Sequence, residues 1–508
     1  MVPTSESTSA PPSREGGRRW SWAELVGADP RSLAAFRIAL GISLLVDLTV
    51  RAPDLTAHYS DAGILPRRAL APLNRLLLPI HRLSGAMEYE AAVFGFAALA
   101  AVALMVGYRT RVATVLCWVL HFSLLDRNPL FLIGGDFMLR VLLFWSMFVP
   151  LGACWSWDSR RRPPPAGAAL PRLMVSIPIA ALFLQVFSVY FFTGILKLEY
   201  KTWLKGDALF LALGSRYHRN TPLGDWLVAY PDICKVLNHA TLLAEIGAPL
   251  LLFVPWRRGP MRTLAVLLGI GLQIGIAACM RIGNFQWSTM LLFIPLLPAW
   301  FWDRFLPALV GGRAGSTSPV ENAVAPQWRG NRFVDVGVGF LAAYTLVLNI
   351  ASLFAHSGSS VSLPGRVEHL GYVLGIDQEW TLFGLREGRQ RTGWTVVPAT
   401  LKDGSVIDLG TGRGTDLFER PANLPAYYRN WRWRELYLRL PTSRFDAHRD
   451  DFMDSLRRDW NAEHPPERQI QKLEVINMID YFYPNGEYSG PEPVPIWPVM
   501  NQKQGERR

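Results

Sequence analysis

ALFLQVFSVYFFTGILK, residues 181–197, decides the fold class, because it is a long apolar run that ends in a lysine. An α-helix needs about 20 mainly apolar residues to cross the hydrocarbon layer of a bilayer. Comparable runs lie near 32–50, 89–107, 111–125, 131–150, 174–196, 238–255, 262–280, 286–302 and 333–355. We therefore expect an all-α polytopic membrane helix bundle. Because two of these runs are short, the expected number of spans is about eight to ten.

The composition also indicates a membrane protein. Half of the 508 residues are hydrophobic, and 18% are charged, whereas soluble domains have about 25%. The net charge is +11, and short loops carry basic clusters such as Arg160–Arg162, which is typical of cytoplasmic loops. We therefore expect the lipid bilayer, and no nucleic acid, as a partner. The predicted location is the cell (inner) membrane, with the N-terminus cytoplasmic and the C-terminal part extracytoplasmic.

Changes in composition divide the chain. We predict a polar, disordered N-terminus at 1–30, a transmembrane domain at 31–305, a linker at 306–332 and a further transmembrane helix at 333–355. A small α+β extramembrane domain follows at 365–490, and a tail at 491–508. Alternating residues at 394–401 and 405–410, joined by Lys402-Asp403-Gly404, predict a hairpin. Residues 444–464 have the spacing of an amphipathic helix, and 473–483 read as a strand.

Polar residues inside the apolar runs are candidates for structural roles. They are Arg37, Asp47, Asp136, Arg140 and Glu245. Asp136 and Arg140 are four residues apart, so we expect them to pair on one helix face. Such groups commonly orient a bundle through hydrogen bonds and ion pairs. The four cysteines share no CxxC spacing, so no metal site is predicted.

Lys197 has two interpretations. Intramembrane ionisable residues are rare and often mark a functional site. Desolvation disfavours the charged form of an amine, and a neutral lysine can act as a base, so Lys197 is the candidate catalytic residue. The alternative is that Lys197 extends its amine from a helix end to the membrane surface.

Seven local strings together resemble the HTTM family, the membrane domain shared with vitamin K-dependent γ-glutamyl carboxylase, in order and over roughly residues 30–305. They are RIALGISLLVDL (37–48), AHYSDAGILPR (57–67), VGYRTRVATVLCW (106–118), DRNPLFLIGGDFMLRVLLFW (126–145), FTGILKLEYKTWLKGDAL (192–209), AEIGAPLLLFVP (244–255) and RIGNFQW (281–287). The C-terminal unit loosely resembles the extramembrane part of bacterial members.

The resemblance implies a site. The carboxylases carry a stretch G-x-x-K-L-D-x-x-W-x-x-G, whose lysine deprotonates a reduced, vitamin K-like quinone before O2 and CO2 react. Gly194, Lys197, Leu198, Trp203 and Gly206 fit this frame, with Glu199 at the acidic position and one extra residue before the tryptophan. A dry pocket would protect such chemistry from water. Trp203, Asn128, Arg281 and Asn284 are the candidate residues of the substrate pocket.

At two positions this chain differs from the carboxylases, which argues against assigning the whole carboxylase reaction to it. Pro129 and Gln273 stand where the carboxylases have histidines, which puts the carboxylation steps in doubt. One hypothesis is therefore a carboxylase-like lyase or quinone epoxidase-like enzyme that uses Lys197 as a base towards a reduced quinone or another lipophilic substrate, with a peptide or protein as a further substrate. The other is a non-catalytic multi-pass scaffold that presents its C-terminal domain outside the cytoplasm.

Overall fold

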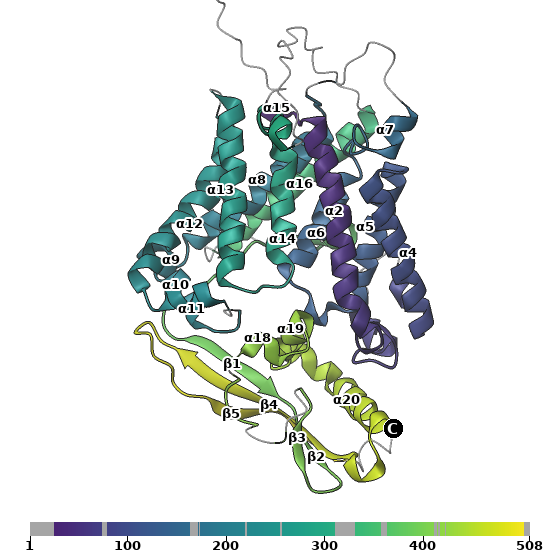
Figure 1. Ribbon diagram of the computed structural model, residues 1–508, viewed down its shortest axis with the longest axis vertical. Helices are drawn as coiled ribbons and strands as arrows, with labels where there is room; N and C mark the ends of the chain where they lie inside the picture. The colour runs from purple at the N-terminus through teal and green to yellow at the C-terminus, as the bar shows by residue number, and fades with distance from the viewer. Residues whose placement is uncertain are drawn as a thin grey trace, which may run out of the picture.

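The computed structural model describes residues 25–73, 79–162, 171, 173–218, 221–254, 257–309, 331–356, 363–410, 414, 417–421 and 423–501. A helical bundle carries a smaller unit with a sheet at one end, opposite the end where helix α2 begins (Figure 1). This arrangement confirms the predicted fold class of a membrane-type helix bundle followed by a small α+β domain.

The bundle contains a helix at each predicted apolar run. These helices are α2 (Pro30–Arg51), α4 (Met87–Val106), α5 (Thr110–Arg127), α6 (Gly134–Ser146), α8 (Ile177–Lys197), α12 (Pro231–Leu251), α13 (Arg258–Cys279), α14 (Phe285–Met290) with the 3₁₀ helix η5 (Leu291–Leu296), α15 (Ala299–Leu309) and α16 (Arg332–His356). Within the described residues, five helical segments are long and apolar enough to cross a membrane, including those of α4, α8 and α13. The remaining bundle helices are shorter or more polar.

Local sequence sets where the helices begin and end. The Asp29 carboxylate accepts a hydrogen bond from the backbone N–H of Arg31 at the start of α2, and the Ser176 hydroxyl caps α8 in the same way. Both caps satisfy an otherwise free amide of the first turn. Helix α4 ends at Gly107, whose positive φ of 74° is readily adopted by glycine.

Shorter helices connect the long ones. They are η1 (Ala52–Asp54), α3 (Leu55–Tyr59), η2 (Arg67–Leu73), η3 (Ile80–Arg82), η4 (Pro129–Phe131), α7 (Trp157–Arg161), α9 (Lys201–Lys205), α10 (Ala208–Gly214) and α11 (Pro222–Val228). Helices α9, α10 and α11 lie at the end of the bundle that faces the sheet (Figure 1). The polar connection after Lys197 therefore forms part of the surface on which the C-terminal unit rests.

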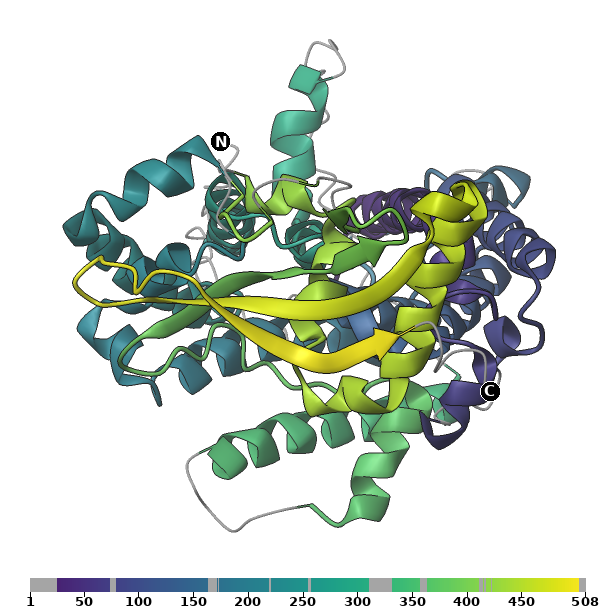
Figure 2. The same cartoon turned by 90° about the horizontal axis from the view of Figure 1, so that it is seen from below.

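The C-terminal unit is built on one antiparallel sheet. Helix α17 (Gly365–Leu374) precedes this unit and packs through Val367, Leu370 and Leu374 against the core of the bundle. The elements of the unit are β1 (Gln390–Val396), β2 (Pro398–Leu401), β3 (Val406–Asp408), α18 (Leu424–Tyr427), α19 (Trp431–Arg439), η6 (Ser443–His448), α20 (Arg449–Glu463), η7 (Pro466–Arg468), β4 (Ile470–Phe482) and β5 (Glu492–Asn501). The order is β1-β4-β2-β3, and β5 also pairs with β4. Seen from below, β4 and β5 extend across the end of the bundle (Figure 2).

The predicted elements of this unit are confirmed. Strands β2 and β3 form the expected hairpin, with Pro398 opposite Asp408, and Gly404 takes the positive φ of 87° that its turn requires. Helix α20 and strand β4 lie where a helix and a strand were predicted.

Two predicted boundaries need correction. The tail predicted from residue 491 is wrong for Glu492–Asn501, because these residues form β5 along β4. At the other terminus, Ala28 pairs with Met174, so the last residues of the segment predicted to be disordered are ordered. Residues 1–24 and most of the predicted linker, 310–330, lie outside the described residues.

Candidate active site around Lys197

Lys197 is the last residue of α8, and its side chain is shielded from solvent. The residue is 3% exposed. Its Nζ atom donates to both carboxylate oxygens of Glu245, at 2.5 Å to Oε1 and 2.6 Å to Oε2. Glu245 lies on α12 and is itself 5% exposed. The amine is therefore held inside the protein by an ion pair and does not extend to the surface.

Gly194 makes this ion pair possible. A Cβ atom at this position would lie 2.6 Å from Cγ1 of Ile246 and 3.3 Å from Cβ of Glu245. The first distance is far below ordinary van der Waals contact, so a larger residue would separate α8 from α12. The glycine of the G-x-x-K sequence thus lets the two helices approach closely enough for the amine to reach the carboxylate.

Trp203 covers the amine from another side. Its ring centroid lies 4.4 Å from the Lys197 Nζ, within the range of a cation–π interaction. The indole Nε1 donates to the carbonyl of Phe383 at 2.9 Å, and Asn238 donates to the carbonyl of Trp203 at 2.9 Å. The first contact fixes the ring from the segment that leads into the sheet, and the second fixes the backbone of Trp203.

The carboxylate changes the expected chemistry of the amine. Burial alone favours a neutral lysine, whereas an adjacent carboxylate stabilises the ammonium form. The pair of Lys197 and Glu245 as a whole carries no net charge. Glu245 was predicted to have a structural role in the bundle, and nothing in the local sequence indicated that it pairs with Lys197, 48 residues away.

A second polar contact lies further along the same face of α8. Tyr190 is seven residues before Lys197, which places both side chains on one side of the helix. Gln273 of α13 donates from Nε2 to the Tyr190 hydroxyl at 2.8 Å. A cavity of about 10 Å³ between these helices is lined by Tyr190 and Ala248, among others.

The three other pocket candidates contact groups other than Lys197. Asn128 caps η4, which begins at Pro129, and donates to the carbonyl of His58 at 2.8 Å. Arg281 is exposed. Asn284 lies near a different cluster of charges, described below. The candidate site is therefore smaller than predicted and consists of Lys197, Glu245 and Trp203.

The HTTM domain family matches residues 27–302, which is more than half of the chain. The chain belongs to the HTTM family. No solved structure matches it. The match includes α8 and α12, so both members of the Lys197–Glu245 pair lie inside the HTTM domain.

A separate cluster of buried charges in the HTTM domain includes a residue of the C-terminal unit. Arg51 donates to Asp47 at 2.7 Å and to Asp136 at 2.8 Å. Arg432, from α19, donates to Asp47 at 2.5 Å and to Asp136 at 2.9 Å. All four residues are at most 3% exposed. Asn284 is at 3.4 Å from Asp136. We call Asp47, Arg51, Asp136 and Arg432 the interdomain charge cluster.

The predicted pair between Asp136 and Arg140 is wrong. Arg140 donates to the Asp377 carboxylate at 2.7 Å, while the ion pairs of Asp136 are made with Arg51 and Arg432. Helical spacing makes a pair possible, but a buried carboxylate between two guanidinium groups is already neutralised. Sequence reasoning missed Arg432 because it lies 296 residues from Asp136.

Arg37 has a different role from the clustered charges. Its guanidinium donates to the carbonyls of Leu104 and Met105 at the end of α4 and to that of Trp155, at 2.7 to 2.8 Å. The last carbonyls of a helix lack partners within the helix and carry partial negative charge. Arg37 therefore ties α2 to the end of α4.

Among the described residues, no group of three metal-ligating side chains comes together.

Proposed function

We propose that this HTTM protein is a membrane enzyme in which Lys197 acts as a base towards a lipophilic substrate with an acidic hydroxyl group. The observation that carries the proposal is the buried amine, bonded to both oxygens of Glu245. A reduced quinone is the substrate that the family resemblance suggests. Buried ionisable pairs are frequent at functional sites, and intramembrane charges are expensive to retain without a function.

The pair supplies a route for the proton. Lys197 passes one of its protons to Glu245 and accepts the proton of the substrate hydroxyl. After this exchange, Glu245 is neutral and the ammonium of Lys197 faces the new oxyanion. The total charge of the site is unchanged, which matters where water is excluded and isolated charges are costly. Trp203 keeps the ammonium in place by its ring contact.

The proposed chemistry is limited to proton transfer at the Lys197–Glu245 pair. The cavity of about 10 Å³ between α8, α12 and α13 is lined by Tyr190 and Ala248, among others, and Lys197 is not part of its lining. We assign no O2 or CO2 chemistry, because Pro129 opens a 3₁₀ helix and Gln273 is bonded to Tyr190.

We also propose the orientation of the chain. Helix α2 begins at the end of the bundle opposite the C-terminal unit (Figure 1). The short loops at the α2 end include the basic clusters Arg109–Arg111 and Arg160–Arg162. Basic short loops favour the cytoplasmic side. This supports a cell-membrane protein whose N-terminus is cytoplasmic and whose C-terminal unit is outside.

The test compares variants of the purified full-length protein. Oxygen uptake with an added naphthohydroquinone is the assay, because the hydroquinone anion that a base produces reacts with dissolved O2 much faster than the neutral hydroquinone. We expect Lys197→Ala to reduce the rate about 10²- to 10⁴-fold, the usual contribution of a positioned base. Lys205→Ala is the matched control, because Lys205 is an exposed lysine of the same stretch and should leave the rate unchanged.

A purely structural ion pair gives different results. The double variant Lys197→Leu/Glu245→Leu replaces the pair by apolar side chains and should insert into the membrane normally. If the pair is catalytic, this variant is folded but inactive. Full activity in this variant or in Lys197→Arg would refute the proposal, as would the absence of any turnover by the unaltered protein. Those outcomes would favour the non-catalytic scaffold.

A further inference from the structure

A cavity of about 610 Å³ lies at the end of the bundle where α2 begins, between the start of α5 and α7. Four arginines line it: Arg109, Arg111, Arg161 and Arg162. All four are exposed, and none has an ion pair within the part of the chain that the structure describes. The cavity therefore carries a net positive charge, which the single carboxylate in its lining, Asp158, offsets only in part.

The carboxylate in this cavity is already engaged by other donors. Asp158 accepts hydrogen bonds from the backbone N–H groups of Arg109 and Thr110, at 2.8 and 2.7 Å, and from the Thr110 hydroxyl at 2.7 Å. It thus fixes the start of α5, including the left-handed Arg109 with a φ of 44°. The arginine side chains remain available to a ligand.

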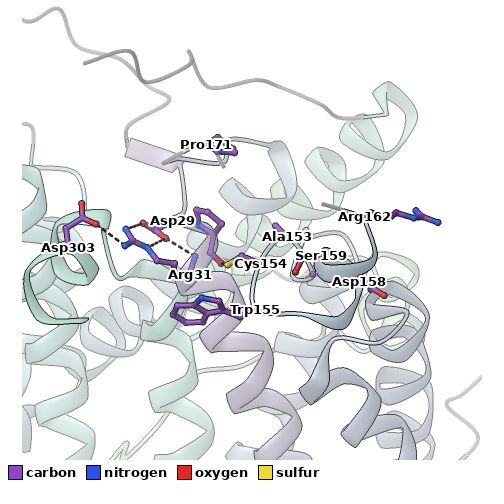
Figure 3. Close-up of a pocket in the computed structure, with 12 residues that line it drawn as sticks. Asp29, Arg31, Ala153, Cys154, Trp155, Asp158, Ser159, Arg162, Pro171 and Asp303 are labelled. Carbon is purple, nitrogen blue, oxygen red and sulfur yellow. Dashed lines mark hydrogen bonds and ion pairs between the residues drawn. The ribbon is translucent and has the colours of Figure 1, made fainter. Parts of the chain in front are cut away.

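The neighbouring cavity, of about 800 Å³, shows the contrast. There, Arg31 is bonded to Asp29 at 2.7 Å and to Asp303 at 2.9 Å (Figure 3). Asp158 and Arg162 line both cavities. In the cavity of about 800 Å³, the charge of Arg31 is therefore neutralised by two carboxylates. In the cavity of about 610 Å³, the four arginines form no ion pair within the described residues.

The surface next to the four arginines is apolar. Val112 and Val115 of α5 are 55% and 42% exposed, and Val106 at the end of α4 is 47% exposed. Two aromatic residues, Tyr108 and Trp157, are 41% and 47% exposed. Tyrosine and tryptophan at such positions are typical of the boundary between lipid headgroups and acyl chains. A ligand here meets positive charge at one end and hydrocarbon-facing residues at the other.

We propose that this cavity binds the phosphate headgroup of an anionic phospholipid, with its acyl chains along Val112 and Val115. Arginine pairs well with phosphate because its planar fork donates two parallel hydrogen bonds. Basic pockets between transmembrane helices are a known means of recognising anionic headgroups. The site is separate from Lys197, which lies at the opposite end of α8.

The experiment is native mass spectrometry of the full-length protein in detergent, with added phosphatidylglycerol or phosphatidylcholine. We expect retention of phosphatidylglycerol in preference to phosphatidylcholine. Arg161→Gln/Arg162→Gln should reduce that preference roughly 30-fold, from the contribution of two arginines near an anionic surface. The control is Arg257→Gln/Arg304→Gln, which removes the same charge from exposed residues at the same end of the bundle and should keep the preference.

Three outcomes would overturn the proposal. One is an equal loss of preference in the control, which would mean that only net charge matters. Another is unchanged preference in Arg161→Gln/Arg162→Gln. The third is complete displacement of phosphatidylglycerol by millimolar inorganic phosphate, which would identify a site for free phosphate without a contribution from the acyl chains. Removing Lys197 should have no effect on this binding, so the result is independent of the proposed catalysis.

Discussion

Replacing Arg432 by methionine should detach the C-terminal unit from the HTTM domain. In the interdomain charge cluster, two carboxylates face two guanidinium groups, and Arg432 contacts both Asp47 and Asp136. Methionine fills similar space but leaves one buried negative charge uncompensated. Breaking a buried ion pair in this way costs about 3 to 5 kcal/mol. On the scale of a domain of about 150 to 250 residues, this corresponds to a decrease of roughly 6 to 20 °C in the melting temperature.

The assay is size-exclusion chromatography of the detergent-solubilised full-length protein after heating, combined with limited proteolysis of residues 363–501. Arg429→Met is the matched control, because Arg429 is 63% exposed and its buried partner Asp54 keeps a hydrogen bond from Asn430, so the loss should be smaller than that of Arg432→Met. Adding Asp47→Asn to Arg432→Met removes the excess charge and should restore at least half of the loss. The reasoning fails if Arg432→Met is no worse than Arg429→Met, or if Asp47→Asn makes it worse.

Two further predictions concern other parts of the structure. Gly194→Ala should reduce hydroquinone oxidation and lower stability by about 1 to 3 kcal/mol, because its Cβ would meet Ile246. An unaltered rate and melting temperature would contradict the close approach of α8 and α12. Burial lowers the pKa of His218, in the loop between α10 and α11, to about 4. Since an unfolded histidine has a pKa near 6.5, the unfolded chain binds more protons between these values. Stability should therefore fall as the pH falls from about 6.5 to 4, and His218→Asn should flatten the melting temperature across that range.

The elements that the sequence predicted well all depend on local patterns. The apolar runs, the hairpin around Gly404 and helix α20 were each located from residues within one element. Lys197 and its motif were singled out in the same way, by one charge at the end of an apolar run. The tail was misjudged because β5 contains several prolines, which are typical of loops but are tolerated in a strand at the edge of a sheet.

The amino-acid sequence by itself determined that this chain is a helical membrane protein, since bilayer thickness sets a length of apolar sequence that can be read residue by residue. It also determined the family through its short motifs. Only the tertiary structure decided which charges meet. Lys197 forms an ion pair with Glu245. Asp136 forms one with Arg432 and not with the neighbouring Arg140. The physical reason is that a buried charge is stabilised by the groups that helix packing brings within a few ångströms, whatever their separation along the chain.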